Sequence, residues 1–118
     1  MLLVVENEPI SRDAFCRLLT KEGYEVMEAT DGVEALNILK THRFDLVITT
    51  LAMPEMNGLT LIDRIRLEWP HTPILLVSAY LSPQGAKAIL GGQVEFLTKP
   101  IDDSQFVATV NRLVPRSA

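Results

Sequence analysis

The sequence predicts an α/β domain in which a five-stranded parallel sheet is covered by helices on both faces. Five short apolar runs alternate with five stretches of helical periodicity, the pattern of consecutive strand–helix units. The runs Leu2–Val5 and Ile74–Val77 contain no polar residue, as is typical of strands buried on both faces. A length of 118 residues with 47% hydrophobic residues suits one domain, so residues 1–118 are expected to form a single unit.

The first strand is expected at Leu2–Val5, and a helix follows it after three polar residues. Pro9 favours the first turn of this helix, because the N–H that proline lacks would have no helical partner there. Gly23 is placed to end the helix in a left-handed cap. The apolar residues that recur along it, and are expected to face the core, are Ile10, Ala14, Leu18 and Leu19.

Residues 24–29 predict a second strand, which is more polar than the others and is therefore expected at an edge of the sheet. Thr30 or Asp31 is placed to cap the next helix. The expected apolar face of that helix consists of Ala35, Leu36 and Leu39. The third strand begins with the apolar run Leu46–Ile48 and leads into two threonines.

The third helix is predicted over about residues 59–69, and Pro70 ends it. Its expected inward residues are Leu61, Ile62 and Ile65. After the fourth strand, Ile74–Val77, a helix is predicted over residues 82–92. Three glycines weaken this helix, since each costs about 1 kcal/mol relative to alanine.

The fifth strand is expected at Val94–Thr98, and Asp102 or Asp103 is placed to open the last helix. The expected inward residues of that helix are Phe106, Val110 and Leu113. With the most polar strand at an edge, the strand order that suits this pattern is 2-1-3-4-5. This is the flavodoxin-like (βα)5 arrangement, with right-handed crossovers.

In such sheets the functional crevice lies at the carboxyl ends of the strands. The polar residues expected to converge there are Glu6, Asn7, Glu8, Thr49, Thr50, Ser78 and Lys99. Acid, amide, hydroxyl and amine groups from four strand ends form the usual anatomy of a functional crevice. A structural explanation competes for some of them, since Glu6 and Asn7 could cap the first helix. His42 and His71 do not fall near these strand ends.

Composition and charge argue against several classes of protein, among them nucleic-acid-binding and membrane-spanning proteins. A formal net charge of −4 argues against a dedicated nucleic-acid surface, which needs clustered basic residues. The single cysteine, Cys16, cannot form an internal disulfide. No apolar run reaches the length of a membrane span. A strand that begins at Leu2 leaves no room for a signal peptide. The expected location is therefore cytoplasmic, with neither nucleic acid nor membrane as partner.

Four segments resemble the signature segments of the receiver domains of two-component response regulators: VVENEP, DLVITTLAMPEMNG, LLVSAY and EFLTKP. They occur in order and span nearly the whole chain. The resemblance implies a non-enzymatic phosphorelay module, in which an aspartate ending the third strand takes a phosphoryl group from a histidine kinase beside a bound magnesium ion. It also implies protein partners (a histidine kinase, an output domain or a second copy) that contact helix four, strand five and helix five.

Carried over residue by residue, the resemblance places Ser78 and Lys99 at the positions that hold the phosphoryl oxygens. Phe96 stands at the position of the switch aromatic, without a hydroxyl. The Glu6-Asn7 pair stands at the acidic pair, so one of the two expected acids is an amide. Thr50 stands at the phosphoacceptor position, where the family pattern has aspartate.

These departures change the expected chemistry. Magnesium is usually held by one or two carboxylates plus phosphate, and only Glu6 remains of the expected acids. Magnesium binding is therefore expected to be weak or absent, and no other cofactor is predicted. Threonine without an activating base is a poor nucleophile, and Lys99 is expected to pair with Glu6. The leading hypothesis is a pseudo-receiver that acts by protein interaction without phosphorylation.

Three alternatives stay open at the level of sequence. The domain could be phosphorylated through another acid of the crevice, either Glu6 or Glu8. Thr50 could be an engineered change from aspartate, although Asn7 as a second loss in the same pocket argues against this. The chain could also be a small flavin- or nucleotide-binding protein of the same fold, but it lacks a glycine-rich phosphate-binding motif.

Overall fold

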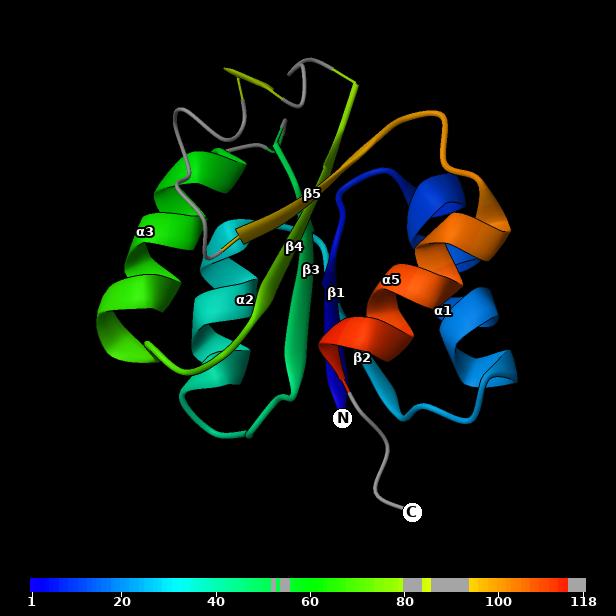
Figure 1. The fold of residues 1–118 in the computed structure, drawn as a ribbon. Coiled ribbons are helices and arrows are strands. Elements are labelled where there is room, and N and C mark those ends of the chain that lie inside the picture. Colours follow the sequence, from blue (N-terminus) through cyan, green and yellow to red (C-terminus); the bar gives the residue numbers. More distant parts are fainter. Residues whose placement is uncertain (52, 54–55, 80–83, 86–93, 115–118) are drawn as a thin grey trace.

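The computed structural model describes residues 1–51, 53, 56–79, 84–85 and 94–114 of the chain. Five strands run parallel in the order β2-β1-β3-β4-β5 (Figure 1), which confirms the predicted flavodoxin-like arrangement. The strands are β1 Leu2–Val5, β2 Val26–Ala29, β3 Leu46–Thr50, β4 Ile74–Ser78 and β5 Val94–Thr98. The helix predicted over residues 82–92 lies almost entirely outside the described residues.

Helices cover both faces of the sheet, with α2 and α3 on one side and α1 and α5 on the other (Figure 1). Their bounds are α1 Pro9–Lys21, α2 Gly32–Leu39, α3 Gly58–Glu68 and α5 Asp103–Leu113. Each face has its own hydrophobic core. The sheet therefore forms the middle layer of three, and its central strands β1, β3 and β4 are buried on both sides.

The central strand β1 shows why its sequence is an unbroken apolar run. Leu3 and Val5 pack into the core beneath α2 and α3, whereas Leu2 and Val4 pack into the core beneath α1 and α5. All four side chains are buried. Burying an aliphatic side chain of this size contributes about 2 kcal/mol, so a polar residue at any of these positions would be costly.

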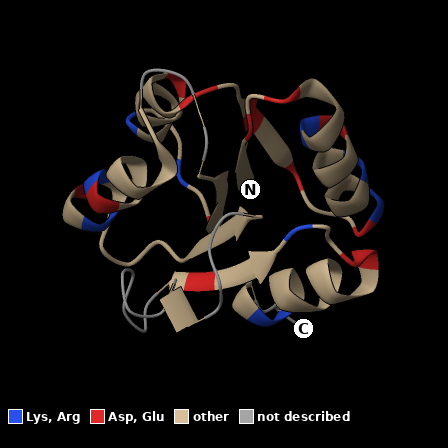
Figure 2. Ribbon diagram, turned by 90° about the horizontal axis from the view of Figure 1, so that it is seen from above, with Lys and Arg blue, Asp and Glu red and all other residues tan. Residues whose placement is uncertain are grey.

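Strand β2 lies at the edge of the sheet, as its polar sequence predicted. Its Glu28 is exposed. Figure 2 shows that charged residues lie mainly on the helices and turns, while the strands carry few of them. No helix in the described part of the chain is long and apolar enough to cross a membrane.

Helix α1 faces the core with only part of its predicted residues: Leu19 is buried and Leu18 packs against the core beneath α1 and α5, but Ile10 and Ala14 do not. Ile10 is 80% exposed and Ala14 is also exposed. The residues that are buried are Phe15 and Leu19, and the Phe15 ring stacks on Phe106 with centroids 5.1 Å apart. The physical reason is the helical period. Leu19 follows Ile10 by about two and a half turns, so the two side chains point in opposite directions.

The ends of the helices follow the predicted capping residues. Gly23 has φ 93° and forms a Schellman cap, in which Tyr24 N donates to Leu19 O and Gly23 N donates to Thr20 O. Asp31 caps α2, since its side chain accepts a hydrogen bond from Glu34 N. Asp102, also predicted, caps α5 in the same way, and Asn57, which was not predicted as a cap, does so for α3.

Gly58, the first residue of α3, sits directly against the end of β3. Its N–H donates to the carbonyl oxygen of Leu51 at 2.7 Å. A Cβ atom at this position would lie 2.9 Å from the Leu51 Cα and still closer to the Thr50 carbonyl oxygen. Only glycine allows this close approach of two backbones, which fixes the end of β3 relative to α3.

Candidate functional site at the carboxyl ends of the strands

A cavity of about 250 Å³ opens at the carboxyl ends of β1, β3, β4 and β5. It is lined by Glu6, Asn7, Glu8, Thr50, Leu51, Val77, Ser78 and Lys99. The structure thus brings together Glu6, Asn7, Thr50, Ser78 and Lys99, the five residues that the sequence placed in one pocket. Their functional roles stay predictions.

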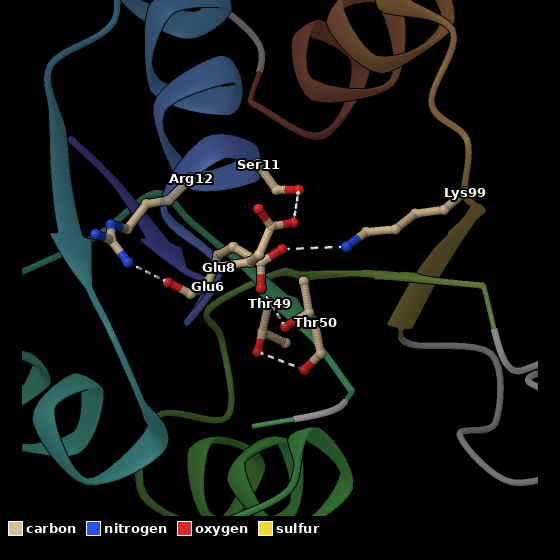
Figure 3. Close-up of polar contacts among 7 residues, drawn as sticks. All are labelled: Glu6, Glu8, Ser11, Arg12, Thr49, Thr50 and Lys99. Carbon is tan, nitrogen blue, oxygen red and sulfur yellow. Dashed lines mark hydrogen bonds and ion pairs between the residues drawn. The ribbon is translucent and has the colours of Figure 1, made fainter. Parts of the chain in front are cut away.

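Glu6 is the centre of the polar contacts in this cavity (Figure 3). Its side chain is buried, and the residue is only 2% exposed. Thr50 Oγ1 donates a hydrogen bond to Glu6 Oε2 at 3.0 Å, and Lys99 Nζ lies 3.1 Å from Glu6 Oε1. Each carboxylate oxygen therefore has a partner, and the ion pair with Lys99 predicted from the sequence is present.

The backbone around Glu6 is held from two sides. Glu6 N donates to the carbonyl oxygen of Ala29 at 3.0 Å, and the Arg12 guanidinium donates to the carbonyl oxygen of Glu6 at 2.8 Å. These contacts fix the position from which the carboxylate reaches into the cavity. Arg12 comes from the second turn of α1, and nothing in the sequence marked it as part of the site.

Helix capping does not explain the polar run after β1. The N-cap residue of α1 is Glu8, which makes no side-chain bond to the helix backbone. Its carboxylate accepts a hydrogen bond from Ser11 Oγ at 3.0 Å. Asn7 is exposed and lines the cavity. The alternative in which Glu6 caps the first helix is therefore wrong, because its carboxylate points to Thr50 and Lys99 instead.

The two threonines at the end of β3 have different surroundings. Thr50 is 4% exposed, and its hydroxyl points to Glu6. Thr49 is fully buried, and its hydroxyl donates to the carbonyl oxygen of Thr50 at 3.1 Å. Thr49 does not line the cavity, so only one of the two hydroxyls that the sequence placed near the crevice reaches it.

Ser78 and Phe96 lie on the neighbouring strands. Ser78 is the last residue of β4, is 3% exposed, and its carbonyl oxygen accepts a hydrogen bond from Lys99 N at 3.1 Å. Phe96 pairs in register with Leu76 and packs against the core beneath α2 and α3. It is half-buried and does not line the cavity, so its predicted switch role would act from outside this site.

The donor set does not fit magnesium. Within the described residues, no group of three or more His, Cys, Asp and Glu side chains lies close enough to hold a metal ion. Of the two carboxylates that line the cavity, Glu6 already bonds to an ammonium and a hydroxyl, and Glu8 is exposed and accepts a hydrogen bond from Ser11. A hydrated magnesium ion requires near-octahedral oxygen ligands and would have to displace Lys99.

Sequence comparisons place the chain among signalling proteins. The model of the response regulator receiver domain family matches residues 2–111. The transcriptional regulatory protein GlrR of Escherichia coli is 35% identical over 118 residues, which cover 99% of this chain and 27% of GlrR. The sensor histidine kinase RcsC of Escherichia coli is 35% identical over 102 residues, 86% of this chain and 11% of RcsC. The chain spans only a part of these longer proteins.

Solved structures show the same fold. The chemotaxis response regulator CheY4 of Vibrio cholerae superposes with a TM-score of 0.85 at 32% identity, covering 95% of this chain and 96% of CheY4. The receiver domain of NtrX from Brucella abortus gives a TM-score of 0.90 at 26% identity, covering 99% and 100%. With the family match over most of its length, the chain belongs to the response regulator receiver domains of two-component systems.

Proposed function

We propose that this receiver domain, as one unit over residues 1–118, is a non-enzymatic pseudo-receiver that signals through protein contacts without aspartyl phosphorylation. The observation that supports this most is the hydrogen bond from Thr50 Oγ1 to Glu6 Oε2 at 3.0 Å. At the position where the family carries its phosphoacceptor aspartate, the side chain is a hydroxyl that donates inward to the remaining acid.

Three properties of Thr50 argue against phosphoryl transfer to it. Its hydroxyl is a weak nucleophile unless a base activates it, and its acceptor, Glu6, is already ion-paired with Lys99. The residue is 4% exposed, which leaves little room for an approaching donor. A phosphothreonine would also be a stable ester, whereas the family's signalling depends on a labile acyl phosphate.

The ion pair within the cavity supports the proposal that the domain signals without phosphorylation. In the family a cation at the Lys99 position holds phosphoryl oxygens, whereas here Lys99 holds Glu6 at 3.1 Å. The cavity therefore neutralises its own charges. We infer that Ser78 and Lys99 now stabilise one conformation instead of responding to a phosphoryl group.

The partners of this domain follow from the family. Relatives include a transcriptional regulatory protein and a sensor histidine kinase, so receiver domains of this kind occur within both kinds of signalling protein. We propose that a kinase, an output domain or a second copy contacts β5, α5 and the helix that the sequence predicts over residues 82–92, ahead of β5. The family match favours this signalling role over the flavin- or nucleotide-binding alternative.

Incubation with acetyl phosphate and Mg²⁺, followed by intact-mass measurement, tests the proposal. The expected spectrum is unchanged, because neither Thr50 nor its surroundings supports transfer. A gain of one phosphoryl group that is lost on mild alkaline treatment would show an acyl phosphate and overturn the proposal. Peptide mapping would then distinguish Glu6 from Glu8 as the acceptor.

A further inference from the structure

A second and larger cavity, of about 730 Å³, lies at the opposite end of the sheet. It is formed where α2 leads into β3 and α3 leads into β4, two turns that lie side by side at the bottom of Figure 1. None of its lining residues belongs to the carboxyl-end cavity. Its volume falls within the range of about 300–1,000 Å³ that is usual for small-molecule sites.

The floor of this cavity is apolar. Leu39 is buried, and Phe44 and Trp69 are half-buried and pack against the core beneath α2 and α3. All three line the cavity. Two aromatic rings and an aliphatic side chain anchored in the core offer a fixed surface for a flat apolar group.

The rim of the cavity is cationic, although the chain as a whole has a net charge of −4. Lys40 and Arg43 line it, and within the described residues neither forms an ion pair or a side-chain hydrogen bond. Most other basic residues that the structure describes are ion-paired: Arg12, Arg17, Arg64, Lys99 and Arg112. Free positive charge therefore gathers at this cavity.

A purely structural explanation accounts for only part of this arrangement. A cation at the end of a helix is stabilised by the helix dipole, which explains Lys40 as the C-cap of α2. That effect fades beyond the last turn, so it does not explain Arg43. Glu68 is the acid on the rim, and it is paired with Arg64 at 4.0 Å. His42 and His71 add ring nitrogens that can donate or accept hydrogen bonds.

We propose that this cavity binds a small organic anion that carries a flat apolar ring system. The ring lies on the floor made by Phe44 and Trp69, and the anionic group meets Lys40 and Arg43. This site is independent of the carboxyl-end cavity, so it does not rest on the absence of phosphorylation. A ligand of the size of a metabolite would bind the domain at this site.

Anilinonaphthalene sulfonate (ANS) is a suitable probe, because it joins apolar rings to one anionic group. Trp69 is the single tryptophan of the chain and lines the cavity, so energy transfer from Trp69 reports ANS bound to the domain, and the variants and chemical-shift mapping below locate it. We expect saturable binding with energy transfer from Trp69. The Lys40→Gln/Arg43→Gln variant should weaken it about fivefold, since two exposed charge contacts contribute about 0.5 kcal/mol each.

Two controls separate this site from general apolar binding. Lys21→Gln removes a lysine on α1, on the other face of the sheet, and should leave ANS affinity unchanged. Phenylnaphthylamine keeps the rings but lacks the sulfonate, and should bind the wild type and the double variant equally. If that variant does not fold, chemical-shift mapping of ANS on the wild type must show changes at residues 39–44 and 68–72. Equal ANS affinity of wild type and double variant, or shifts elsewhere, would overturn the proposal.

Discussion

Charged side chains are paired at one end of the sheet and lack ion-pair partners among the described residues at the other. At the carboxyl ends, Glu6 is buried and both of its carboxylate oxygens are bonded, one to Thr50 and one to Lys99. At the other end, Lys40 and Arg43 line a cavity about three times larger without an ion-pair partner among the described residues. Glu6 and Lys99 thus pair with each other at the carboxyl ends, whereas Lys40 and Arg43 at the other end have no ion-pair partner among the described residues.

If the proposed function holds, this fold is kept without the reaction of its family. The sheet order and the pocket residues Ser78 and Lys99 do not depend on a carboxylate at position 50. Thr50 fits because its hydroxyl finds an acceptor in Glu6 and is not left as an unpaired buried polar group. The substitution is thus compatible with stability but not with acyl phosphate formation.

The substitution expected to destabilise the domain most adds a methyl group where the start of α3 contacts the end of β3. Gly58→Ala would place a methyl group against the backbone of Thr50 and Leu51, so that α3 or the end of β3 must shift. We expect a loss of about 3 kcal/mol in the free energy of unfolding, measured by urea denaturation. Gly32→Ala is a useful comparison, because its methyl group would meet the side chain of Met56, which can move. An equal loss for both variants would contradict this explanation.

Removing the acid at the centre of the carboxyl-end cavity should have the next largest effect. Glu6→Ala leaves the Thr50 hydroxyl buried without its acceptor and removes the partner of Lys99. Because Lys99 is 29% exposed and can turn toward water, the expected loss is about 2 kcal/mol, less than for a fully buried pair. Thermal unfolding measures it. Glu95→Ala, which breaks the exposed pair with Arg112, should lose clearly less.

Substituting Thr50 alone is expected to lower the free energy of unfolding by a smaller amount. Thr50→Val keeps the shape of the side chain but removes the hydrogen bond to Glu6, at a cost of about 1 kcal/mol. Thr50→Ser keeps the donor and should preserve the bond. The carboxylate carbon shift of Glu6, followed by NMR, should therefore change in the valine variant and stay close to wild type in the serine variant. The reverse order would show that the contact with Glu6 does not hold Thr50.

The smallest effect on stability is expected at the opposite end. Lys40→Gln/Arg43→Gln removes exposed charges that have no ion-pair partner among the described residues, so unfolding should change by no more than about 0.5 kcal/mol. The same variant should lower ANS affinity. A large loss of stability would mean that these charges support the fold, and the contrast between the two ends would fail.

Much of the fold could be predicted from the sequence because local chemistry and global pattern agree. The unbroken apolar run Leu2–Val5 and the polar strand at residues 26–29 define the centre and edge of the sheet. Gly23 and Asp31 mark helix ends through backbone conformation and capping. The buried face of α1 was predicted only in part: Leu18 and Leu19 contact the core, whereas Ile10 and Ala14 are apolar yet exposed.

The site was predictable in its members and in the ion pair between Glu6 and Lys99, but not in its other contacts. The rule that parallel strands place their carboxyl ends together was enough to gather Glu6, Thr50 and Lys99. The hydrogen bond from Thr50 to Glu6 depends on side-chain directions that the sequence does not contain. The cavity at residues 39–44 and 68–72 was missed for the same reason, since it exists only where two turns pack side by side.

The central claim is that Thr50 and Asn7 together remove phosphorylation from a fold that otherwise supports it. The most direct test treats wild type and the Asn7→Asp/Thr50→Asp variant with acetyl phosphate and Mg²⁺ in parallel, and follows intact mass. We predict no change for the wild type and a Mg²⁺-dependent gain of one alkali-labile phosphoryl group for the variant. Phosphorylation of the wild type at an acidic residue would contradict the account.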